Sequence, residues 1–384
     1  KLSLKSFLKQ TKHIVNQKNY KKLSRNIVIG NESGDLDSIV SSITYSFLNS
    51  SLNGLEEMKE NSNIYFPILN FEKEDLKLRR EVYVLFKKLR IDEDSLIFYE
   101  DLDEEFKLNS KWTIVDHNLL NPNQIQYKDQ VVRIIDHHLD SKFQYINLEK
   151  KDIALVGSCS SLIAKNSLFS GRLLPKELDL VTKLLSAAII VDTVNFDEDH
   201  KKVTDTDREM FRLLEKTYQP LSNFMEASEL FKWLNEEKFN TTEFTNYECM
   251  RQDYKGYKED NGLAYGICSI KRLFSEWFEK EESTKDICKI FTEQKKLDLL
   301  LIMASGSNKD NKFERQLLIY VPTHSKLVGI ENLITSSQSL KLEPYLSQHW
   351  NENQPHLSCY LQGNSTASRK KVQPILSKIV REIQ

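Results

Sequence analysis

The sequence has few of the residues that break or bend a chain, and it has no long apolar run. Only 11 glycines and 8 prolines occur among 384 residues, which excludes collagen-like and linker-dominated proteins. The five cysteines are scattered and form no Cys-x-x-Cys pair, which argues against a disulfide framework or a thiolate zinc site and favours a reducing compartment. No apolar run reaches the ~18 residues of a membrane span.

Neither sign of charge is in excess. Lys and Arg number 54 and Asp and Glu number 56, for a net charge of -2. A nucleic-acid-binding protein usually has a basic excess, so we expect no nucleic-acid partner. Hydrophobic residues make up 40% and charged residues 29%, as in a soluble globular protein. We therefore expect a cytoplasmic monomer with no membrane partner, and a basic opening segment that forms an amphipathic helix rather than a transit peptide.

Four short apolar runs in the first half of the chain each lead to an aspartate. Such nearly continuous runs of four or five residues are typical of strands buried on both faces. The runs are Asn26–Gly30, Trp112–Val115, Val131–Ile135 and Ala187–Val191. The segments between them have helical periodicity, as in Ile39, Ile43 and Phe47. This alternation predicts an α/β domain with a parallel sheet.

The aspartates near the ends of these runs predict a metal site. Open parallel sheets bind ligands at the carboxyl ends of their strands, so the carboxylates would gather at one edge. They belong to Asp35, Asp37, Asp116, Asp136 and Asp192, and three histidines adjoin two of them: His117, His137 and His138. One aspartate after a strand is usually a turn former or a helix N-cap, but turn chemistry alone hardly explains four such strands.

Clustered carboxylates repel one another, so a cation is needed to hold them together. Oxygen ligands with one or two imidazoles favour Mg²⁺, Mn²⁺ or Co²⁺ over structural zinc. Four carboxylates can hold two ions ~3.5–4 Å apart, the arrangement of phosphate-cleaving enzymes. The residues thus predict metal-assisted phosphoryl chemistry.

The motifs around these residues resemble those of the DHH phosphoesterase superfamily. They are GNESGDLDS (30–38), VDHN (115–118), IIDHH (134–138), VGSCSSL (156–162) and IIVDT (189–193). They most resemble the fungal cytosolic exopolyphosphatase branch, which includes the animal prune proteins, with family II inorganic pyrophosphatase as a more distant relative. Asp253–Lys255 and Ser368–Lys371 resemble two basic motifs of the second domain, DHHA2.

The resemblance implies two domains, with the active-site cleft between them. Residues 1–217 would form a parallel-sheet DHH domain that binds metal, and residues 218–384 a smaller α/β DHHA2 domain that binds phosphate. The expected hinge is Thr217–Pro220. In the second domain the sequence predicts strands at 263–270, 297–303, 316–321 and 356–361, and a helix at 368–383.

The resemblance also implies roles for single residues. Two divalent ions, Mg²⁺, Mn²⁺ or Co²⁺, would be held by Asn31, Asp35, Asp37, Asp116, His137 and Asp192. Asp116 would bridge the ions, and His138 would contact a substrate phosphate or assist proton transfer. The implied catalytic residues are Asp37, Asp116 and His138. The remaining phosphates would be held by Lys255, Arg369 and Lys370.

The implied function is an exopolyphosphatase, which releases terminal orthophosphate from inorganic polyphosphate through a metal-activated water. Asn31 supports this branch, because the pyrophosphatases have a metal-binding histidine at that place; as an amide oxygen, Asn31 would hold its ion less tightly. His117 matches the pyrophosphatase branch, so a family II-type inorganic pyrophosphatase stays open. A prune-like short-chain polyphosphatase with a scaffolding role is the other alternative.

One motif has two readings from the residues alone. The turn Val156–Ser161 is either a helix N-cap with small residues packed on the sheet, or a set of amides and hydroxyls near the substrate. Cys159 within it is expected to be a small buried residue rather than a nucleophile, because no base for a thiolate mechanism is visible.

Overall fold

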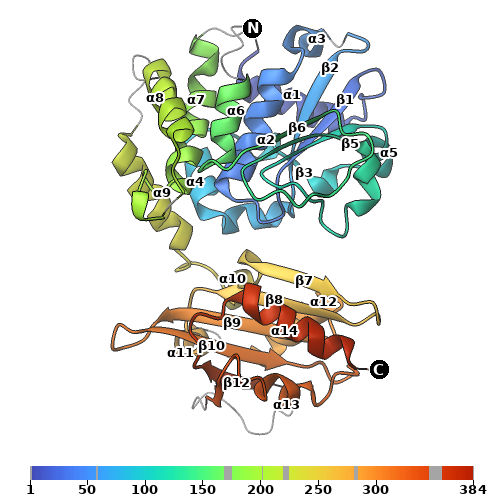
Figure 1. Cartoon of the computed structure of the whole chain (residues 1–384). Coiled ribbons are helices and arrows are strands. Elements are labelled where there is room, and N and C mark those ends of the chain that lie inside the picture. The colour runs from blue at the N-terminus through green and yellow to red at the C-terminus, as the bar shows by residue number, and fades with distance from the viewer. Residues whose placement is uncertain are drawn as a thin grey trace. The chain divides into compact units, whose positions relative to one another are not determined.

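A computed structural model describes residues 2–57, 59–167, 175–200, 202–218, 225–280, 284–345 and 357–383. The chain divides into two compact units, Lys1–Lys238 and Phe239–Gln384 (Figure 1). Among the described residues, no helix combines the length and the hydropathy that crossing a lipid bilayer requires.

The first unit is built on a six-stranded sheet in which every neighbouring pair is parallel. Its strands are β1 (Ser24–Ile29), β2 (Asn63–Leu69), β3 (Ile97–Phe98), β4 (Lys111–Val115), β5 (Val131–Asp136) and β6 (Lys150–Ile153). Three of the predicted strands are confirmed as β1, β4 and β5. The strand order β3-β2-β1-β4-β5-β6 reverses direction between β1 and β4, which makes this the switch point where ligands bind in such sheets.

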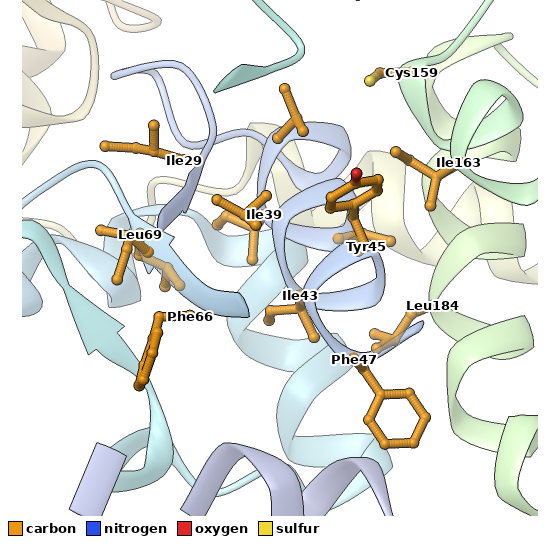
Figure 2. Packing of buried hydrophobic residues seen from close by; sticks show 14 of the residues in the cluster. Ile29, Ile39, Ile43, Tyr45, Phe47, Phe66, Leu69, Cys159, Ile163 and Leu184 are labelled. Carbon is orange, nitrogen blue, oxygen red and sulfur yellow. The ribbon is translucent and has the colours of Figure 1, made fainter. Parts of the chain in front are cut away.

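Helices pack on this sheet and bury a large apolar core. They are α1 (Leu4–Asn16), α2 (Leu36–Asn49), α3 (Leu52–Glu56), α4 (Arg80–Leu89), α5 (Glu104–Leu108), α6 (Cys159–Ser167), α7 (Pro175–Asp192), α8 (Asp205–Tyr218) and α9 (Ala227–Phe239). Helix α1 is amphipathic, as predicted, with Phe7, Leu8 and Ile14 buried. Helix α2 is buried along almost its whole length between β2 and the helices α6 and α7 (Figure 2).

The predicted strand over Ala187–Val191 is wrong, because these residues form the last turns of α7. Ala187, Ala188 and Ile189 are all fully buried. A helix that is packed on every side has a continuous apolar run, and periodicity alone cannot distinguish such a run from a buried strand. Asp192 therefore reaches the site from the end of a helix rather than from the end of a strand.

The second unit contains a mixed six-stranded sheet of order β11-β12-β10-β9-β8-β7. Its strands are β7 (Tyr254–Lys258), β8 (Ala264–Ile270), β9 (Leu299–Ser307), β10 (Phe313–Tyr320), β11 (Leu342–Pro344) and β12 (Leu357–Gln362). Only β8 and β9 pair in parallel. The four strands predicted for this half are found as β8, β9, β10 and β12, although His356, in the last predicted range, lies outside the described residues.

The helices of the second unit are α10 (Asn246–Gln252), α11 (Phe274–Lys280), α12 (Thr284–Lys295), α13 (Ile330–Thr335) and α14 (Arg369–Arg381). The predicted C-terminal helix is confirmed as α14. Its Val372, Leu376 and Val380 join Leu301 of β9 and Ile319 of β10 in one apolar cluster. This packing fixes the start of α14 against the sheet.

The two units divide at Lys238, later than the boundary expected between residues 217 and 218. Helix α9 accounts for the difference, because its Leu230 and Leu234 are buried in the core of the first unit. Glu237 at its end also forms a 2.8 Å ion pair with Arg80 of α4. Residues 219 and 220 of the expected hinge lie outside the described residues.

Candidate metal centre

The first acidic pair lies at the start of α2, just after β1. Asp35 is the N-cap of this helix, and its Oδ1 accepts a 3.0 Å hydrogen bond from the backbone N–H of Ser38. The preceding Gly34 has a φ of +59°, and a Cβ at this position would lie 2.3 Å from the Phe71 ring. The loop therefore requires glycine, and it places Asp35 and Asp37 at the switch point of the sheet.

Asp37 is almost completely buried, and the turn Gly157–Ser161 surrounds its carboxylate. Its Oδ1 accepts hydrogen bonds from Ser158 Oγ (2.8 Å), Ser160 N (2.8 Å) and Ser160 Oγ (2.6 Å), and its Oδ2 accepts one from Cys159 N (2.6 Å). Burial opposes ionisation, but His137 and these hydroxyl groups lower the pKa of Asp37. The amides and hydroxyls of the turn thus bind a carboxylate of the protein itself, and their nearness to a substrate stays a prediction.

Asp116 follows β4 in a left-handed conformation, with a φ of +59°. Its Oδ2 accepts hydrogen bonds from Ser38 Oγ (2.6 Å) and Asn31 Nδ2 (2.9 Å). Among the described residues, no group donates a hydrogen bond to the other oxygen, Oδ1, which is buried and lies 3.1 Å from His137 Nε2. Burial, with the neighbouring charges of Asp35 and Asp37, raises the pKa of Asp116 to about 8.

His137 directs one ring nitrogen into the site. Its Nδ1 lies 3.0 Å from the carbonyl oxygen of Val156, and since a carbonyl only accepts, Nδ1 carries the proton of the neutral ring. In the neutral ring that binds a metal, Nε2 is then the ligand atom, and it lies 3.1 Å from Asp116 Oδ1 and 3.9 Å from Asp37 Oδ2. Without a metal, burial disfavours the charged ring, but Asp116 and Asp37 outweigh burial and raise the pKa of His137 to about 10.

His138 is held by the buried carboxylate of Asp136. Its Nδ1 lies 2.8 Å from Asp136 Oδ1, and the same oxygen accepts the backbone N–H groups of His137 and His138. The hydrogen bond that His138 donates to Asp136 raises the pKa of His138. The His138 side chain is 56% exposed, so the carboxylate holds the ring in a fixed orientation that solvent or a ligand can reach.

Asp192, the last residue of α7, joins the group beside Asp37. Burial and the charge of Asp37 raise the pKa of Asp192, so the metal-free pair shares a proton. Ligand atoms of Asp37, His137 and Asp192 lie within 4.8 Å of one another, and so do those of Asp116, His137 and His138. The two groups meet at His137.

These residues fit a divalent cation. The site holds a buried carboxylate oxygen without a hydrogen bond, an imidazole nitrogen 3.1 Å from that oxygen, and carboxyl groups whose repulsion is relieved by bound protons. A bound cation would replace those protons and remove the repulsion between the carboxylates. Oxygen with one or two imidazole nitrogens is a donor set for Mg²⁺, Mn²⁺ or Co²⁺.

Asn31 lies beside Asp116, as the predicted site requires, but its amide is engaged at both ends. Its nitrogen donates to Asp116, and its Oδ1 accepts from the backbone N–H groups of Ser33 (2.9 Å) and Gly34 (3.3 Å). In this arrangement Asn31 supports the loop and Asp116. His117, for which the sequence predicts no ligand or catalytic role, has a buried Nε2 without a hydrogen-bond partner among the described residues.

The three predicted phosphate-binding cations lie in the second unit. Arg369 and Lys370 begin α14, and Lys255 lies in β7 (Figure 1). The Arg369 guanidinium donates to the backbone oxygen (2.8 Å) and to Oδ1 (2.6 Å) of Asp253. Because Lys255 follows Asp253 by two residues, this bond brings the start of β7 and the start of α14 together.

Sequence reasoning missed the polar residues that hold the ligands in place. They include Ser38, which donates to Asp116, Asp207, which accepts hydrogen bonds from Gly157 N and Ser161 Oγ, and the serines of the turn Gly157–Ser161. The available signal was a series of small polar residues in otherwise apolar surroundings. Around Asp207 the pattern Thr-x-x-Asp indicates only the start of a helix.

Comparisons with known proteins agree with this organisation. The model of the DHH family N-terminal domain matches residues 25–190, and that of the DHHA2 domain matches residues 232–379. Exopolyphosphatase PRUNE1 of Rattus norvegicus is 30% identical over 362 residues, which cover 92% of this chain and 74% of that protein. A Schizosaccharomyces pombe protein, also named as an exopolyphosphatase, is 30% identical over 378 residues, which cover 94% of this chain and 92% of that protein.

A solved structure shares the fold. It is described as a family II inorganic pyrophosphatase of Methanococcus jannaschii, and it aligns with a TM-score of 0.55 at 19% identity, covering 93% of this chain and 99% of that one.

Proposed function

Because the chain belongs to the DHH phosphoesterase family and carries the DHHA2 domain, we propose that it is a metal-dependent exopolyphosphatase. Its substrate would be inorganic polyphosphate, from which it releases terminal orthophosphate. The observation that carries the proposal is the group of buried Asp37 with partly buried His137 and Asp192, which shares His137 with Asp116 and His138. Relatives at 30% identity that are named exopolyphosphatase support the substrate.

The residues of the first unit would hold two divalent ions. The ligands would be Asp35, Asp37, Asp116, His137 and Asp192, with Asn31 beside Asp116. When bound, the ions would supply the positive charge that activates water and neutralises a phosphoryl group. The hydrogen bonds of the serine turn and of Val156 fix the Asp37 and His137 ligand atoms before any ion arrives.

His138 would act on the substrate itself. Its Nδ1 is bonded to Asp136, so Nε2 is the nitrogen left for a phosphate oxygen. Since its pKa is raised, the ring is more often protonated at neutral pH than an ordinary histidine. It can therefore donate a hydrogen bond or a proton to a phosphate oxygen.

The cations of the second unit would hold the phosphates that the metals do not reach. Lys255, Arg369 and Lys370 would provide this charge, and the positive end of the α14 dipole would add to it. Removing substrate charge in this way stabilises both the transferring group and the leaving chain.

The proposal is tested by phosphate release from long-chain polyphosphate, tripolyphosphate and pyrophosphate, each with Mg²⁺, Mn²⁺ or Co²⁺. We expect stepwise release from long chains that stops at pyrophosphate, with products sized on a gel, and no release in excess EDTA. Metal-independent release would contradict the metal centre. Activity confined to other phosphate esters would contradict the substrate.

A second candidate function is a family II-type inorganic pyrophosphatase. His117 favours it, because that branch also has histidine at this place. In the same assay it predicts rapid cleavage of pyrophosphate with long chains untouched. A third outcome, slow cleavage of short chains with a stably bound protein partner, would indicate a prune-like scaffold.

A further inference from the structure

Asp207 is a buried carboxylate that lies outside both groups of candidate metal ligands. It is fully buried in the first turn of α8 and accepts four hydrogen bonds. Its Oδ2 accepts from Gly157 N (2.8 Å), Thr204 N (2.8 Å) and Thr204 Oγ1 (2.6 Å), and its Oδ1 accepts from Ser161 Oγ (2.6 Å). Two of the four donors belong to Thr204, directly before α8, and the other two lie at the ends of the turn Gly157–Ser161.

The middle of the same turn holds Asp37. Ser158, Cys159 and Ser160 together donate four hydrogen bonds to the Asp37 carboxylate, at 2.6–2.8 Å. Asp207 thus accepts hydrogen bonds from both ends of the turn, while the residues between those ends donate hydrogen bonds to Asp37. A shift of the turn would move these four donors of Asp37 at once, whereas the fifth donor, Ser41 Oγ at 3.4 Å, lies on α2 with Asp37 itself.

Close packing extends this connection toward Asp192. A Cβ at Gly157 would lie 2.7 Å from Thr193 Cγ2, 2.9 Å from the backbone oxygen of Lys202 and 3.0 Å from Asp207 Oδ2. Thr193 directly follows Asp192, and α8 packs along α7 (Figure 1). The turn that begins at Gly157 therefore touches the end of α7, which carries Asp192, and also binds the Asp37 carboxylate.

We propose that Asp207 is a positioning residue of the metal centre. By anchoring the turn Gly157–Ser161, it holds Asp37 at the distance from Asp192 and His137 that a cation requires, against the repulsion of the two carboxylates. The inference rests on the metal centre of the proposed function, and it does not depend on the substrate. It predicts that Asp207 governs metal affinity although it does not touch the metal.

The geometry predicts different results for two substitutions. Asp207→Asn can keep its oxygen at the three donors on Oδ2, while its amide nitrogen donates to Ser161 Oγ, so the turn stays anchored. Asp207→Ala removes all four hydrogen bonds and leaves two backbone N–H groups buried without partners. If Asp207 acts by anchoring the turn, Asp207→Asn should therefore keep its function. If Asp207 acts through its negative charge, Asp207→Asn should lose it.

The experiment is a calorimetric titration of the metal-free full chain with Mn²⁺. We expect Asp207→Ala to weaken binding about tenfold, the low end of the effect of outer-shell residues on metal affinity, and Asp207→Asn to stay within about threefold of wild type. Asp205→Ala is the matched control, because Asp205 is exposed in the same turn of α8. It should leave the affinity unchanged.

Thr204→Ala separates the anchor from the simple capping of α8. It removes the hydroxyl that donates to Asp207 but keeps the bonds to Gly157 and Ser161, so it should lower the melting temperature without weakening Mn²⁺ binding. If Asp207→Ala does not fold, Gly157→Ala displaces the same junction by crowding, and it should weaken Mn²⁺ binding.

Three results would overturn the inference: unchanged Mn²⁺ affinity in folded Asp207→Ala, unchanged affinity in Gly157→Ala, or an Asp207→Asn as weak as the alanine variant. A wild-type chain that binds Mn²⁺ but leaves polyphosphate intact would refute the proposed substrate and keep the inference. A wild-type chain that binds no Mn²⁺ would refute both the proposed metal centre and the role of Asp207.

Discussion

Asp116 combines an unusual backbone conformation with a buried, repelled carboxylate. Aspartate tolerates a φ of +59° better than most residues, so the position suits its backbone as well as its charge. Asp35 and Asp37 raise its pKa, while His137 lowers it. Such a residue costs stability in the metal-free protein, and its position is explained by the cation that it would bind.

Asp116→Ala should therefore remove nearly all phosphate release and leave the fold intact. We expect a loss of about a thousandfold or more, the equivalent of roughly 4 kcal/mol in the barrier. Asp116→Asn is the control, because asparagine also tolerates the left-handed conformation; it should be inactive as well and more stable than the alanine variant. A folded Asp116→Ala with substantial turnover would exclude Asp116 as a shared ligand.

The metal-free protein should become less stable as the pH rises. The folded pKa of Asp116 is about 8 and that of His137 is about 10, against ordinary values of 3.8 and 6.5. Between each pair of values the folded state holds a proton that the unfolded chain releases, so raising the pH favours unfolding. The Asp116 contribution is lost between pH ~4 and ~8, and that of His137 between pH ~6.5 and ~10.

Thermal unfolding in EDTA from pH 6 to pH 9 tests this. We expect the melting temperature to fall by several degrees, and to fall less in saturating Mn²⁺, because the cation replaces the protons. Asp116→Asn should show a shallower decline than the wild type. A melting temperature that rises with pH in EDTA would show that these two groups do not control stability in this range.

The N-terminus of α2 carries two functions in one element. Asp35 caps the helix, and it also belongs to the predicted ligands. Because the first turn of a helix leaves backbone N–H groups without intrahelical partners, a carboxylate at this place is favoured even without a metal. The structural and the chemical roles of Asp35 can be separated, since asparagine caps helices as well as aspartate does.

We expect Asp35→Asn to keep the stability of the metal-free protein and to weaken its stabilisation by Mn²⁺. Asp35→Ala should in addition cost about 1 kcal/mol of unfolding free energy, through the lost cap. Denaturant unfolding with and without Mn²⁺ measures both effects. Ser3→Ala is the control, because Ser3 caps α1 and lies outside both candidate ligand groups, so it should affect stability alone. An Asp35→Asn that keeps full Mn²⁺ stabilisation would remove Asp35 from the ligands.

Helix α7 contributes a candidate metal ligand from its C-terminal end, where the sequence predicted a strand. Its residues Ala187–Val191 are apolar and buried, yet its end carries Asp192. A helix end can place a side chain as well as a strand end can, so the wrong element prediction still led to a residue that lies in the site. The carboxylate at position 192 was the informative feature, and the secondary structure before it was not.

At the scale of the whole molecule, the proposed chemistry needs both units. The first unit contains the candidate metal ligands, and the second contains Lys255, Arg369 and Lys370. In the second unit Arg369 is bonded to Asp253, so its cation serves the fold as well as the proposed phosphate site. The monomeric state, the cytoplasmic location and the absence of nucleic-acid and membrane partners stay predictions of the sequence.

Arg369→Ala should raise KM for tripolyphosphate about tenfold with little change in kcat, because a charge-assisted hydrogen bond contributes about 1.5–3 kcal/mol. Asp253→Asn is the matched control, because it removes the counter-charge and keeps the cation. If Arg369 binds phosphate, this variant keeps or improves KM in steady-state kinetics. If Arg369 only joins β7 to α14, both variants lose affinity together, and the phosphate-binding role is wrong.

The sequence by itself determined the fold class, the identity of the candidate metal ligands and the family. These follow from local patterns: apolar runs of strand length, carboxylates and histidines directly after them, and motifs in a fixed order. Only the tertiary structure decided that Ala187–Val191 is helical, that serines hold Asp37, that Arg369 binds Asp253 and that Asp207 anchors the turn. The physical reason is separation along the chain, because Asp37 and Ser160 lie 123 residues apart and meet only through packing, which leaves no local signal.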